Sequence, residues 1–261
     1  MVIIEGEADL ERRFGGLRRL YGDAGYARIR AARFAIVGVG GVGSWCAEAL
    51  ARSGVAGLTL IDLDHVSESN VNRQIQATSA TLGHAKVLAL RDRIAGIHPG
   101  CDVTCVEEFV DDENWPQLLP RAVDVVIDAC DQVRAKTAIA AWALRTHSAL
   151  ITAGAAGGKR HPHAVQVEDL GLVTHDPLLA ALRQRLRKQH GAARSGKIGV
   201  RCVFSREAVV APVEACGVDD ENAASLDGNL NCHGYGSSVG VTATFGMVAA
   251  SLALESVAAQ K

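Results

Sequence analysis

A glycine-rich turn between an apolar run and a helical segment most constrains what this 261-residue chain can fold into. Residues 34–37 are apolar, Gly38-Val39-Gly40-Gly41-Val42-Gly43 follows, and residues 45–53 have the pattern of a helix. The first two glycines of such a turn permit a tight bend near a phosphate, and the last lets the helix lie close to the strand. The N-terminus of the helix favours anionic oxygens. The turn predicts a nucleotide-binding α/β fold, although a glycine turn without a ligand has the same pattern.

Further apolar runs alternate with helical patterns after this turn. We expect strands at residues 34–37, 58–63, 103–106, 123–127 and 149–153, and helices at residues 45–53, 87–97 and 136–146. Such alternation is typical of a parallel sheet with helices on both faces. Only 4% of residues are aromatic against 48% hydrophobic, which suits a sheet of β-branched residues under alanine-rich helices. The expected fold class is α/β, with a doubly wound, mainly parallel sheet.

The alternation loosens after residue 160. Residues 165–167 and 201–204 are expected as short strands of an antiparallel extension, residues 176–190 as a basic helix, and residues 214–235 as a mobile loop. We therefore expect one domain with four parts: an N-terminal helical arm (1–33), a nucleotide-binding core (34–160), an insertion (161–235) and a C-terminal helix (236–261).

Residues 237–259 are apolar enough to raise the question of a membrane span. Because this stretch contains Gly240, Gly246 and Glu255, we expect a buried helix on the sheet and no stable membrane association. A formal net charge of −2 gives no whole-chain signal for nucleic-acid binding. Seven cysteines without a Cys-x-x-Cys pair fit the reducing cytoplasm and argue against a structural zinc site.

Polar residues gather where the second predicted strand ends. Asp62 stands where such folds place a carboxylate for ribose hydroxyls. Asn70, Arg73 and Lys86 follow it, and together they would neutralise more negative charge than a dinucleotide carries. Singly, each is as well explained by a solvated loop or an ion pair. Together they favour a triphosphate, which points to ATP.

Two carboxylates, Asp128 and Asp131, end the fourth predicted strand. The carboxyl ends of parallel strands face the ligand crevice, and carboxylates there suit Mg²⁺ bound to phosphate. The sequence therefore predicts a magnesium site at this edge of the sheet.

The spaced motifs resemble those of the family that activates ubiquitin and ubiquitin-like proteins, whose bacterial members (HesA, MoeB and ThiF) include the adenylyltransferases of molybdopterin and thiamine synthesis. The motifs are Gly38 to Gly43, Asp62-Leu-Asp64, Asn70-x-x-Arg73-Gln74, Gly83-x-x-Lys86 and Asp128-x-x-Asp131. The resemblance covers roughly residues 10–255. It implies adenylation of a carboxylate by Mg-ATP with release of pyrophosphate.

One branch of this family, which dehydrates threonylcarbamoyladenosine in tRNA, is resembled more closely. The shared segments are Arg12-Arg13-Phe14-Gly15-Gly16, Leu20-Tyr21-Gly22, Asn72-Arg73-Gln74-Ile75, residues 199–205 and residues 241–246. In that branch adenylation makes the carboxylate electrophilic, and an internal nitrogen closes a ring and expels AMP. No protein nucleophile is needed, because the effective molarity of an internal nitrogen is high.

The resemblance also implies roles for individual residues. The nucleotide pocket would be lined by Gly38, Gly40, Gly41 and Gly43, and the ribose would be reached by Asp62 and Asp64. The phosphates would be held by Asn70, Arg73, Gln74 and Lys86. Asp131 would position Mg²⁺. Arg13 would reach into the partner's site in a homodimer. Arg13, Arg73, Lys86 and Asp131 are thus the expected catalytic residues.

The tRNA itself has a candidate surface in a basic stretch that contains no acid. Its members are Arg183, Arg185, Arg187, Lys188, His190, Arg194, Lys197 and Arg201. They predict a phosphate-tracking surface or, equally well from the residues alone, a solvated helix face.

Two rival functions remain open on the sequence. One is an adenylyltransferase that activates the C-terminus of a ubiquitin-like sulfur-carrier protein, and the other is a non-catalytic dinucleotide-binding sensor. Cys202, Cys216 and Cys232 are free thiols or serve sulfur transfer with a sulfur-relay partner. The branch often has an acid before Pro162, where this chain has His161, so a polar or monovalent-cation role at that position is in doubt. The spacing of His161, His163 and His175 matches no standard metal-ligand set.

Overall fold

One seven-stranded sheet forms the centre of the protein, whose computed structural model describes residues 8–210 and 235–259. The strands are β1 (Arg33–Val37), β2 (Gly57–Ile61), β3 (Asp102–Val106), β4 (Val125–Asp128), β5 (Leu150–Ala153), β6 (Val165–Asp169) and β7 (Arg201–Ser205). Their order across the sheet is β3-β2-β1-β4-β5-β7-β6. Neighbouring strands are parallel except β6 and β7, which are antiparallel. The predicted doubly wound sheet is confirmed.

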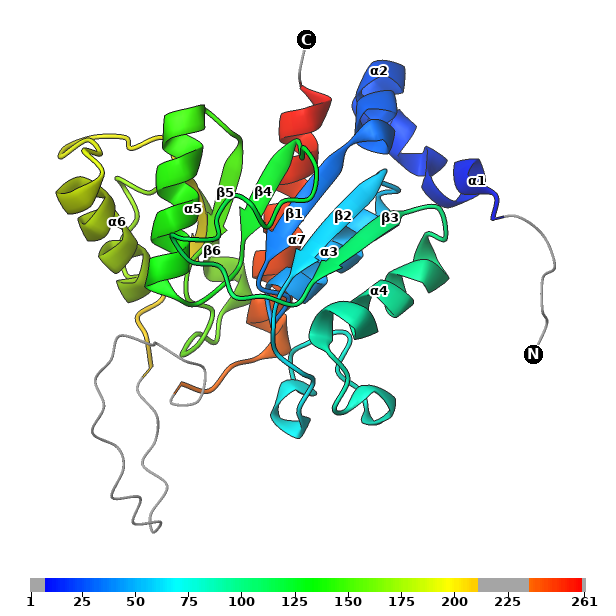
Figure 1. Ribbon diagram of the computed structural model, residues 1–261, viewed down its shortest axis with the longest axis horizontal. Coiled ribbons are helices and arrows are strands. Elements are labelled where there is room, and N and C mark those ends of the chain that lie inside the picture. Colours follow the sequence, from blue (N-terminus) through cyan, green and yellow to red (C-terminus); the bar gives the residue numbers. More distant parts are fainter. Residues whose placement is uncertain (1–7, 211–234, 260–261) are drawn as a thin grey trace.

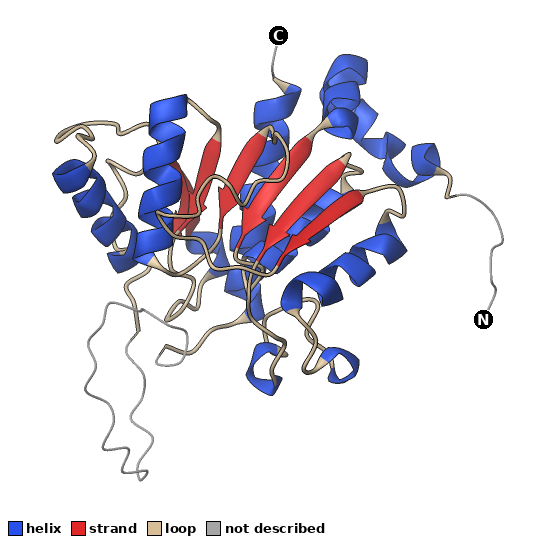
Figure 2. Ribbon diagram, viewed as in Figure 1, coloured by secondary structure: helices blue, strands red, loops and turns tan. Residues whose placement is uncertain are grey.

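Helices cover both faces of the sheet (Figures 1 and 2). One face is packed by α2 (Arg18–Ala31), α3 (Gly43–Arg52), α4 (Lys86–Ile97) and α7 (Val239–Ala258). The other is packed by α5 (Val133–Thr146) and α6 (Pro177–Gln189). The short α1 (Leu10–Phe14) precedes α2 at the N-terminal side, and 3-10 turns lie at Gly15–Leu17, Glu68–Asn70, Ser79–Thr81 and Pro162–Ala164.

The strand order reverses between β1 and β4. The chain runs from β1 outward through β2 to β3 and then returns to β4 on the other side of β1. The loops that leave β1 and β4 therefore diverge, and a crevice opens at the carboxyl ends of these strands. This reversal places the glycine turn opposite the loop that carries Asp131.

The apolar helix α7 lies against the sheet and α3 (Figure 1). Val241, Phe245 and Ala249 are fully buried on it. A side chain at Gly246 would place its Cβ 2.4 Å from the Val42 carbonyl oxygen, so this glycine permits the close contact with α3. Within the described residues α7 is long and apolar enough to cross a membrane, with half of its apolar window buried inside the protein. The prediction of a buried core helix is confirmed.

The region after residue 160 differs from its prediction in one respect. The two predicted strands form an antiparallel pair, as expected, but β7 also belongs to the parallel part of the sheet. β7 pairs in parallel with β5 and lies between β5 and β6. The basic helix α6 begins at Pro177, one residue after the predicted start. Asp176 caps it, because its side chain accepts a hydrogen bond from the backbone N–H of Leu179.

Candidate functional site

A pocket of about 620 Å³ lies at the carboxyl ends of the parallel strands. It is lined by the loops that follow β1 to β5, with additions from the start of α6 and from the segment after β7. The predicted site residues that line it are Gly38, Gly40, Gly41, Asp62, Asp64, Asn70, Arg73, Gln74, Lys86 and Asp131. Its size lies within the range of small-molecule sites, and its walls combine apolar and charged groups. Of the predicted set, Gly43 and Arg13 do not line the pocket.

The glycine turn is shaped by close backbone contacts. Gly38 has φ +80°, and a Cβ there would lie 2.9 Å from backbone atoms of Cys130. A Cβ at Gly43 would lie 1.9 Å from the carbonyl oxygen of Gly38. Gly43 therefore allows α3 to begin directly against the turn, while Gly40 and Gly41 border the pocket itself.

Asp62 fixes the glycine turn to the end of β2. Its Oδ2 accepts a hydrogen bond of 2.8 Å from the backbone N–H of Val39, and its Oδ1 accepts one of 3.0 Å from that of Asp64. Burial raises the pKa of the Asp62 carboxyl, and the nearby Lys86 ammonium opposes that rise. The carboxylate thus aligns two loops of the pocket as well as lining it.

Lys86 is the first residue of α4 and is 7% exposed. Its Nζ lies 2.6 Å from Oδ2 of Asp64, whose side chain is 55% exposed. The ammonium is therefore held at the pocket wall by a carboxylate that itself reaches solvent. This arrangement keeps a cation in position for an anionic ligand.

The segment between β2 and α4 supplies a second cation and several amides. Arg73 donates through Nη1 to the Ser69 carbonyl and, at 2.9 Å, to Oδ1 of Asn72. Asn70 is buried, and its Oδ1 accepts from the backbone N–H of Ser67 at 3.1 Å. Arg73 is thus pre-positioned at the pocket by its own loop.

Gln74 and Gln76 connect this segment to the glycine turn. Both are buried, and Nε2 of Gln76 donates to the Val39 carbonyl at 2.8 Å and to Oε1 of Gln74 at 3.3 Å. Sequence reasoning missed Gln76, although it lies two residues beyond the motif that contains Gln74. Its role depends on a contact with a residue 37 positions away.

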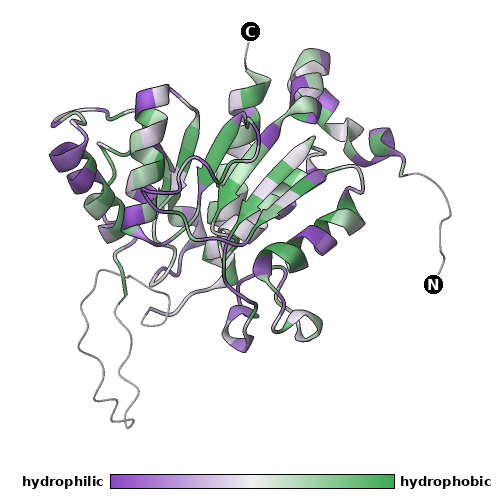
Figure 3. Cartoon of the chain, in the orientation of Figure 1, coloured by the Kyte–Doolittle hydropathy of each residue, from purple (hydrophilic) through white to green (hydrophobic). Residues whose placement is uncertain are grey.

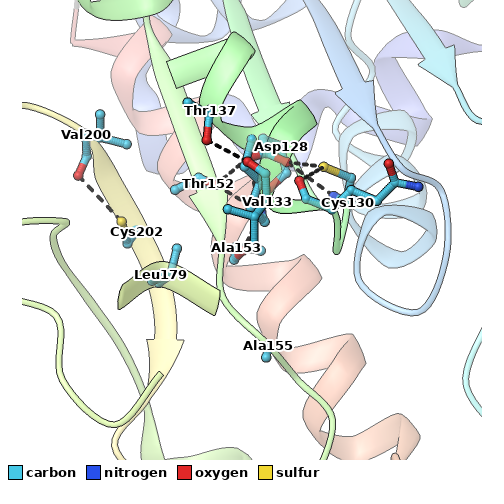
Figure 4. A network of polar contacts seen from close by, with 12 residues as sticks. Asp128, Cys130, Val133, Thr137, Thr152, Ala153, Ala155, Leu179, Val200 and Cys202 are labelled. Carbon is cyan, nitrogen blue, oxygen red and sulfur yellow. Dashed lines mark hydrogen bonds and ion pairs between the residues drawn. The ribbon is translucent and has the colours of Figure 1, made fainter. Parts of the chain in front are cut away.

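The prediction that Asp128 faces the crevice is wrong. Asp128 is fully buried, and its Oδ2 lies 3.1 Å from Nζ of the equally buried Lys136. The hydroxyl of Thr152 and the thiol of Cys130 also donate to the Asp128 carboxylate (Figure 4). Burial alone would lower the pKa of Lys136, but the adjacent Asp128 carboxylate outweighs it and the pKa is raised. All positions around Asp128 are taken, so only Asp131 presents a carboxylate to the pocket from this loop.

The carboxylates of the pocket can be compared with the ligands that the predicted magnesium site requires. Among residues 8–210 and 235–259, no three His, Cys, Asp or Glu side chains gather in a way that would hold a metal ion. Mg²⁺ in phosphate-binding sites commonly uses one or two carboxylates together with phosphate oxygens and waters. Asp131 presents an exposed carboxylate to the pocket, which fits that kind of site and not an all-protein cage.

A further wall of the pocket, formed by residues 154–157, 177–178 and 209, is held in place from behind by two carboxylates that sequence reasoning missed. Asp176 caps α6, and its Oδ2 accepts from the backbone N–H of Ala155 at 2.9 Å. Burial raises the pKa of Asp176. Glu207 accepts at 2.9 Å from the backbone N–H groups of Arg160 and His161. A carboxylate therefore does reach the segment before Pro162, but it comes from a residue far along the chain.

Arg13 lies outside the pocket of its own chain. Its Nη1 donates to the Ile97 carbonyl at 2.7 Å, at the last residue of α4. Lys86 begins the same helix, so the two ends of α4 are about 16 Å apart at the usual helical rise. Within its own chain, Arg13 is therefore remote from the Lys86 end of the pocket.

Of the three cysteines considered for sulfur transfer, only Cys202 lies among the described residues. Cys202 is fully buried in the core beneath α5 and α6, and burial raises the pKa of its thiol. This environment excludes the sulfur-transfer role left open for Cys202. Cys216, Cys232 and the predicted loop 214–235 lie outside the described residues, except for Tyr235, which lines the pocket.

The basic stretch lies on and after α6, whose outer side is hydrophilic (Figure 3). Arg183 is half-buried and donates to the carbonyls of Leu170 and Val173, at 3.1 and 2.7 Å. Arg187 donates to the Ala193 carbonyl at 2.9 Å. The exposed members are Arg185, Lys188, His190, Arg194, Lys197 and Arg201. Two of the predicted cations thus have structural roles, and six face solvent.

Several known proteins are similar to this chain over nearly its whole length. A tRNA threonylcarbamoyladenosine dehydratase of Escherichia coli is 44% identical over 95% of this chain and 94% of its own length. A protein of the same name from Haemophilus influenzae is 39% identical over 96% of this chain and 95% of its own. The structure of the E. coli tRNA N6-threonylcarbamoyladenosine dehydratase, TcdA, in complex with ATP matches with a TM-score of 0.84 and 42% identity. That match covers 98% of this chain and 97% of the other.

The family model described as the ThiF family matches residues 13–259. That range includes the glycine turn, both loops that carry the charged groups, and α7. The resemblance drawn from the spaced motifs is confirmed, and the chain belongs to the ThiF family.

Proposed function

We propose that this chain adenylates the carboxylate of threonylcarbamoyladenosine in tRNA with ATP, and that the adenylate then cyclises with net loss of water. The observation that carries the proposal is the convergence of the glycine turn, Arg73, Lys86 and Asp131 on one pocket. Relatives 44% and 39% identical over nearly the whole chain bear the dehydratase name, which supports the choice of substrate. One structure of the E. coli relative contains ATP and another contains AMP, which are the nucleotide substrate and product of such a reaction.

In this proposal, the substrate carboxylate attacks the α-phosphorus of ATP, and pyrophosphate leaves. The nitrogen inside the threonylcarbamoyl group then attacks the activated carbon and expels AMP. Negative charge accumulates on the phosphate during the first step, and fixed cations stabilise it. Arg73 and Lys86 are held at the pocket wall by Ser69, Asn72 and Asp64, so they need no rearrangement to act.

The remaining proposed roles follow from position. Gly40 and Gly41 border the pocket beside the start of α3, where backbone N–H groups favour phosphate oxygens. Asp62 and Asp64 lie at the end of β2, where the ribose hydroxyls are expected. Asp131 would hold Mg²⁺, which when bound would neutralise phosphate charge. Asn70 and Gln74 would hydrogen-bond the phosphates from the same loop.

We also propose a cytoplasmic homodimer in which Arg13 completes the partner's pocket. Support comes from the position of Arg13 at the far end of α4, outside its own pocket. The exposed cations on and after α6 would follow the tRNA backbone. A sulfur-relay partner would depend on Cys216 or Cys232, because Cys202 is buried.

A test of this function measures AMP formed from ATP with three acceptors. These are tRNA that carries threonylcarbamoyladenosine, the same tRNA without the modification, and a ubiquitin-like sulfur-carrier protein. The proposal predicts AMP release only with the modified tRNA. Pyrophosphate exchange only with the carrier protein would instead identify a carrier adenylyltransferase. Nucleotide binding without turnover in every mixture would identify a sensor.

A further inference from the structure

Lys159 is a buried cation whose hydrogen-bond acceptors are all backbone carbonyls. Lys159 is only 2% exposed. Nζ donates to the carbonyl oxygen of His175 at 3.1 Å, to that of Ser205 at 3.5 Å, and to that of Glu207. Within the described residues, no carboxylate lies within ion-pairing distance of this ammonium. The three carbonyls therefore take the place that an acidic partner usually has.

These carbonyls belong to the segments that form one wall of the pocket. Gly157 lines the pocket two residues before Lys159, Pro177 lines it two residues after His175, and Val209 lines it two residues after Glu207. Asp176 adds a direct link, because it accepts from Ala155 on the first of these segments. A single ammonium thus joins three loops that are distant in sequence.

Burying the Lys159 ammonium away from carboxylates has an electrostatic cost, which its hydrogen bonds to the three loops offset. Taking an ammonium out of water is unfavourable unless every proton finds an acceptor. Burial lowers the pKa of Lys159, while the Asp176 and Glu207 carboxylates oppose that change from a greater distance. Several converging backbone carbonyls are also the ligands that proteins use for K⁺. The three carbonyls around Nζ of Lys159 are therefore acceptors of the kind that also coordinate a small monovalent cation.

We propose that the ammonium of Lys159 is a covalently attached monovalent cation that positions the acceptor-side wall of the pocket. This wall lies across the Asp131 loop from the glycine turn and Lys86, so it borders the place where the carboxylate to be adenylated would enter. The assignment of that side to the acceptor rests on the proposed function. Lys159 is a positioning residue, because it acts through the three loops and does not line the pocket itself.

The proposal makes a prediction about salts that an ordinary core lysine does not. The wild-type protein carries its own cation and is indifferent to the kind of monovalent cation in the buffer. Lys159→Ala removes the ammonium and leaves space beside the three carbonyls, so K⁺ or NH₄⁺ can replace it. Lys159→Met fills most of the same space with an apolar chain, so added cations cannot enter. Choline is too large to bind among the carbonyls and matches the ionic strength.

The experiment compares wild type, Lys159→Ala and Lys159→Met in choline, potassium and ammonium chlorides at equal ionic strength. Thermal unfolding is measured together with kcat and KM for modified tRNA and for ATP. In choline we expect both variants to lose about tenfold in kcat/KM for tRNA, with KM for ATP little changed, because misplacing a wall by a fraction of an ångström has such effects. Potassium or ammonium should raise the melting temperature and restore the tRNA activity of Lys159→Ala alone.

Equal melting temperatures and equal kcat/KM for all three proteins in choline would overturn the proposal. So would recovery of Lys159→Met alongside Lys159→Ala, because that would be a general salt effect. The cation-specific rise in melting temperature needs no turnover, so it remains informative even if the dehydratase activity is absent. If Lys159→Ala yields no folded protein in any salt, Lys159→Gln decides: its amide keeps N–H donors without charge. Reduced tRNA kcat/KM in Lys159→Gln supports the need for a cation, and wild-type activity contradicts it.

Discussion

Lys136 Nζ lies 3.1 Å from Asp128 Oδ2, and both side chains are completely buried at the end of β4. The same ammonium donates to the Thr152 hydroxyl at 3.1 Å and to the Ala153 carbonyl at 2.7 Å, on the neighbouring β5. The pair therefore joins two adjacent strands directly beneath the loop that carries Asp131. Its contribution is structural, and its effect on the pocket is exerted through that loop.

Replacing Lys136 tests the buried pair. Lys136→Met leaves the Asp128 carboxylate buried without its cation, and we expect a loss of about 3 to 5 kcal/mol in the free energy of unfolding. Urea denaturation measures it. Arg134→Met is the matched control on the same helix: its pair with Asp112 has side chains 74% and 72% exposed. That control should change stability by less than about 0.5 kcal/mol. An equally small effect for Lys136→Met would show that the pair does not hold the strands.

The glycine turn has a similarly direct test. The Cβ of Gly43→Ala would lie 1.9 Å from the Gly38 carbonyl oxygen, so the turn or the start of α3 has to shift. We expect KM for ATP to rise about tenfold or more, because the turn borders the proposed phosphate site. ATP titration by calorimetry gives an independent measure of the same loss.

Gly96→Ala provides the control for that glycine substitution. Gly96 lies in α4 with no atom within 4 Å of a built Cβ. Alanine there should leave stability unchanged or raise it slightly, because Gly96 lies in the last turn of α4, where alanine is favoured over glycine and has room. ATP affinity should be unchanged. Equal ATP affinities in both variants would contradict the role given to Gly43.

Glu207 predicts a pH dependence of stability. Burial acts to raise the pKa of this carboxyl, but hydrogen bonds from the backbone N–H groups of His161 and Arg160 outweigh it, and the pKa is lowered. The ionised form therefore contributes stability above the ordinary glutamate pKa, and this contribution is lost as the pH falls through the lowered value. Wild type should be more stable than Glu207→Gln at neutral pH, and the difference should vanish in acid. Denaturation of both proteins across pH checks this, and a constant difference would refute it.

The proposed role of the exposed α6 cations in tRNA binding can be tested separately from ATP binding. Reversing two of them, in Arg185→Glu with Lys188→Glu, should raise KM for modified tRNA about tenfold and leave KM for ATP unchanged. The slope of log affinity against log salt should fall by about 1.5 to 2. Arg91→Glu on α4, which packs on the opposite face of the sheet, is the control. If that control weakens tRNA binding as much as the α6 variant, the proposed surface is wrong.

Most of the fold follows from the sequence because periodicity and the glycine turn are local signals. Residues 34–37 and the helix after Gly43 are defined within a few positions of one another, and the structure has them where predicted. Asp62, Arg73, Lys86 and Asp131 also line one pocket as expected, because the carboxyl ends of parallel strands meet at one edge.

The parts that sequence reasoning missed depend on contacts between distant residues. Asp128 ends β4 and Asp131 follows three residues later, and Asp128 is buried among Lys136, Thr152 and Cys130, of which two come from other elements. The position of β7 between β5 and β6 is likewise a pairing choice that neither strand's residues reveal. The sequence assigns no role to Lys159, because the carbonyls of His175 and Glu207 that surround its ammonium are distant along the chain.

We propose above that this pocket adenylates a carboxylate in tRNA and that the resulting adenylate cyclises. The most direct measurement is mass spectrometry of nucleosides from modified tRNA after incubation with the protein and Mg-ATP. Asp131→Ala is compared with Asp92→Ala, which removes an exposed carboxylate on α4 that does not line the pocket. We expect threonylcarbamoyladenosine to lose the mass of one water with wild type and with Asp92→Ala, and we expect Asp131→Ala to abolish the loss. An unchanged nucleoside with the wild-type protein would contradict the account.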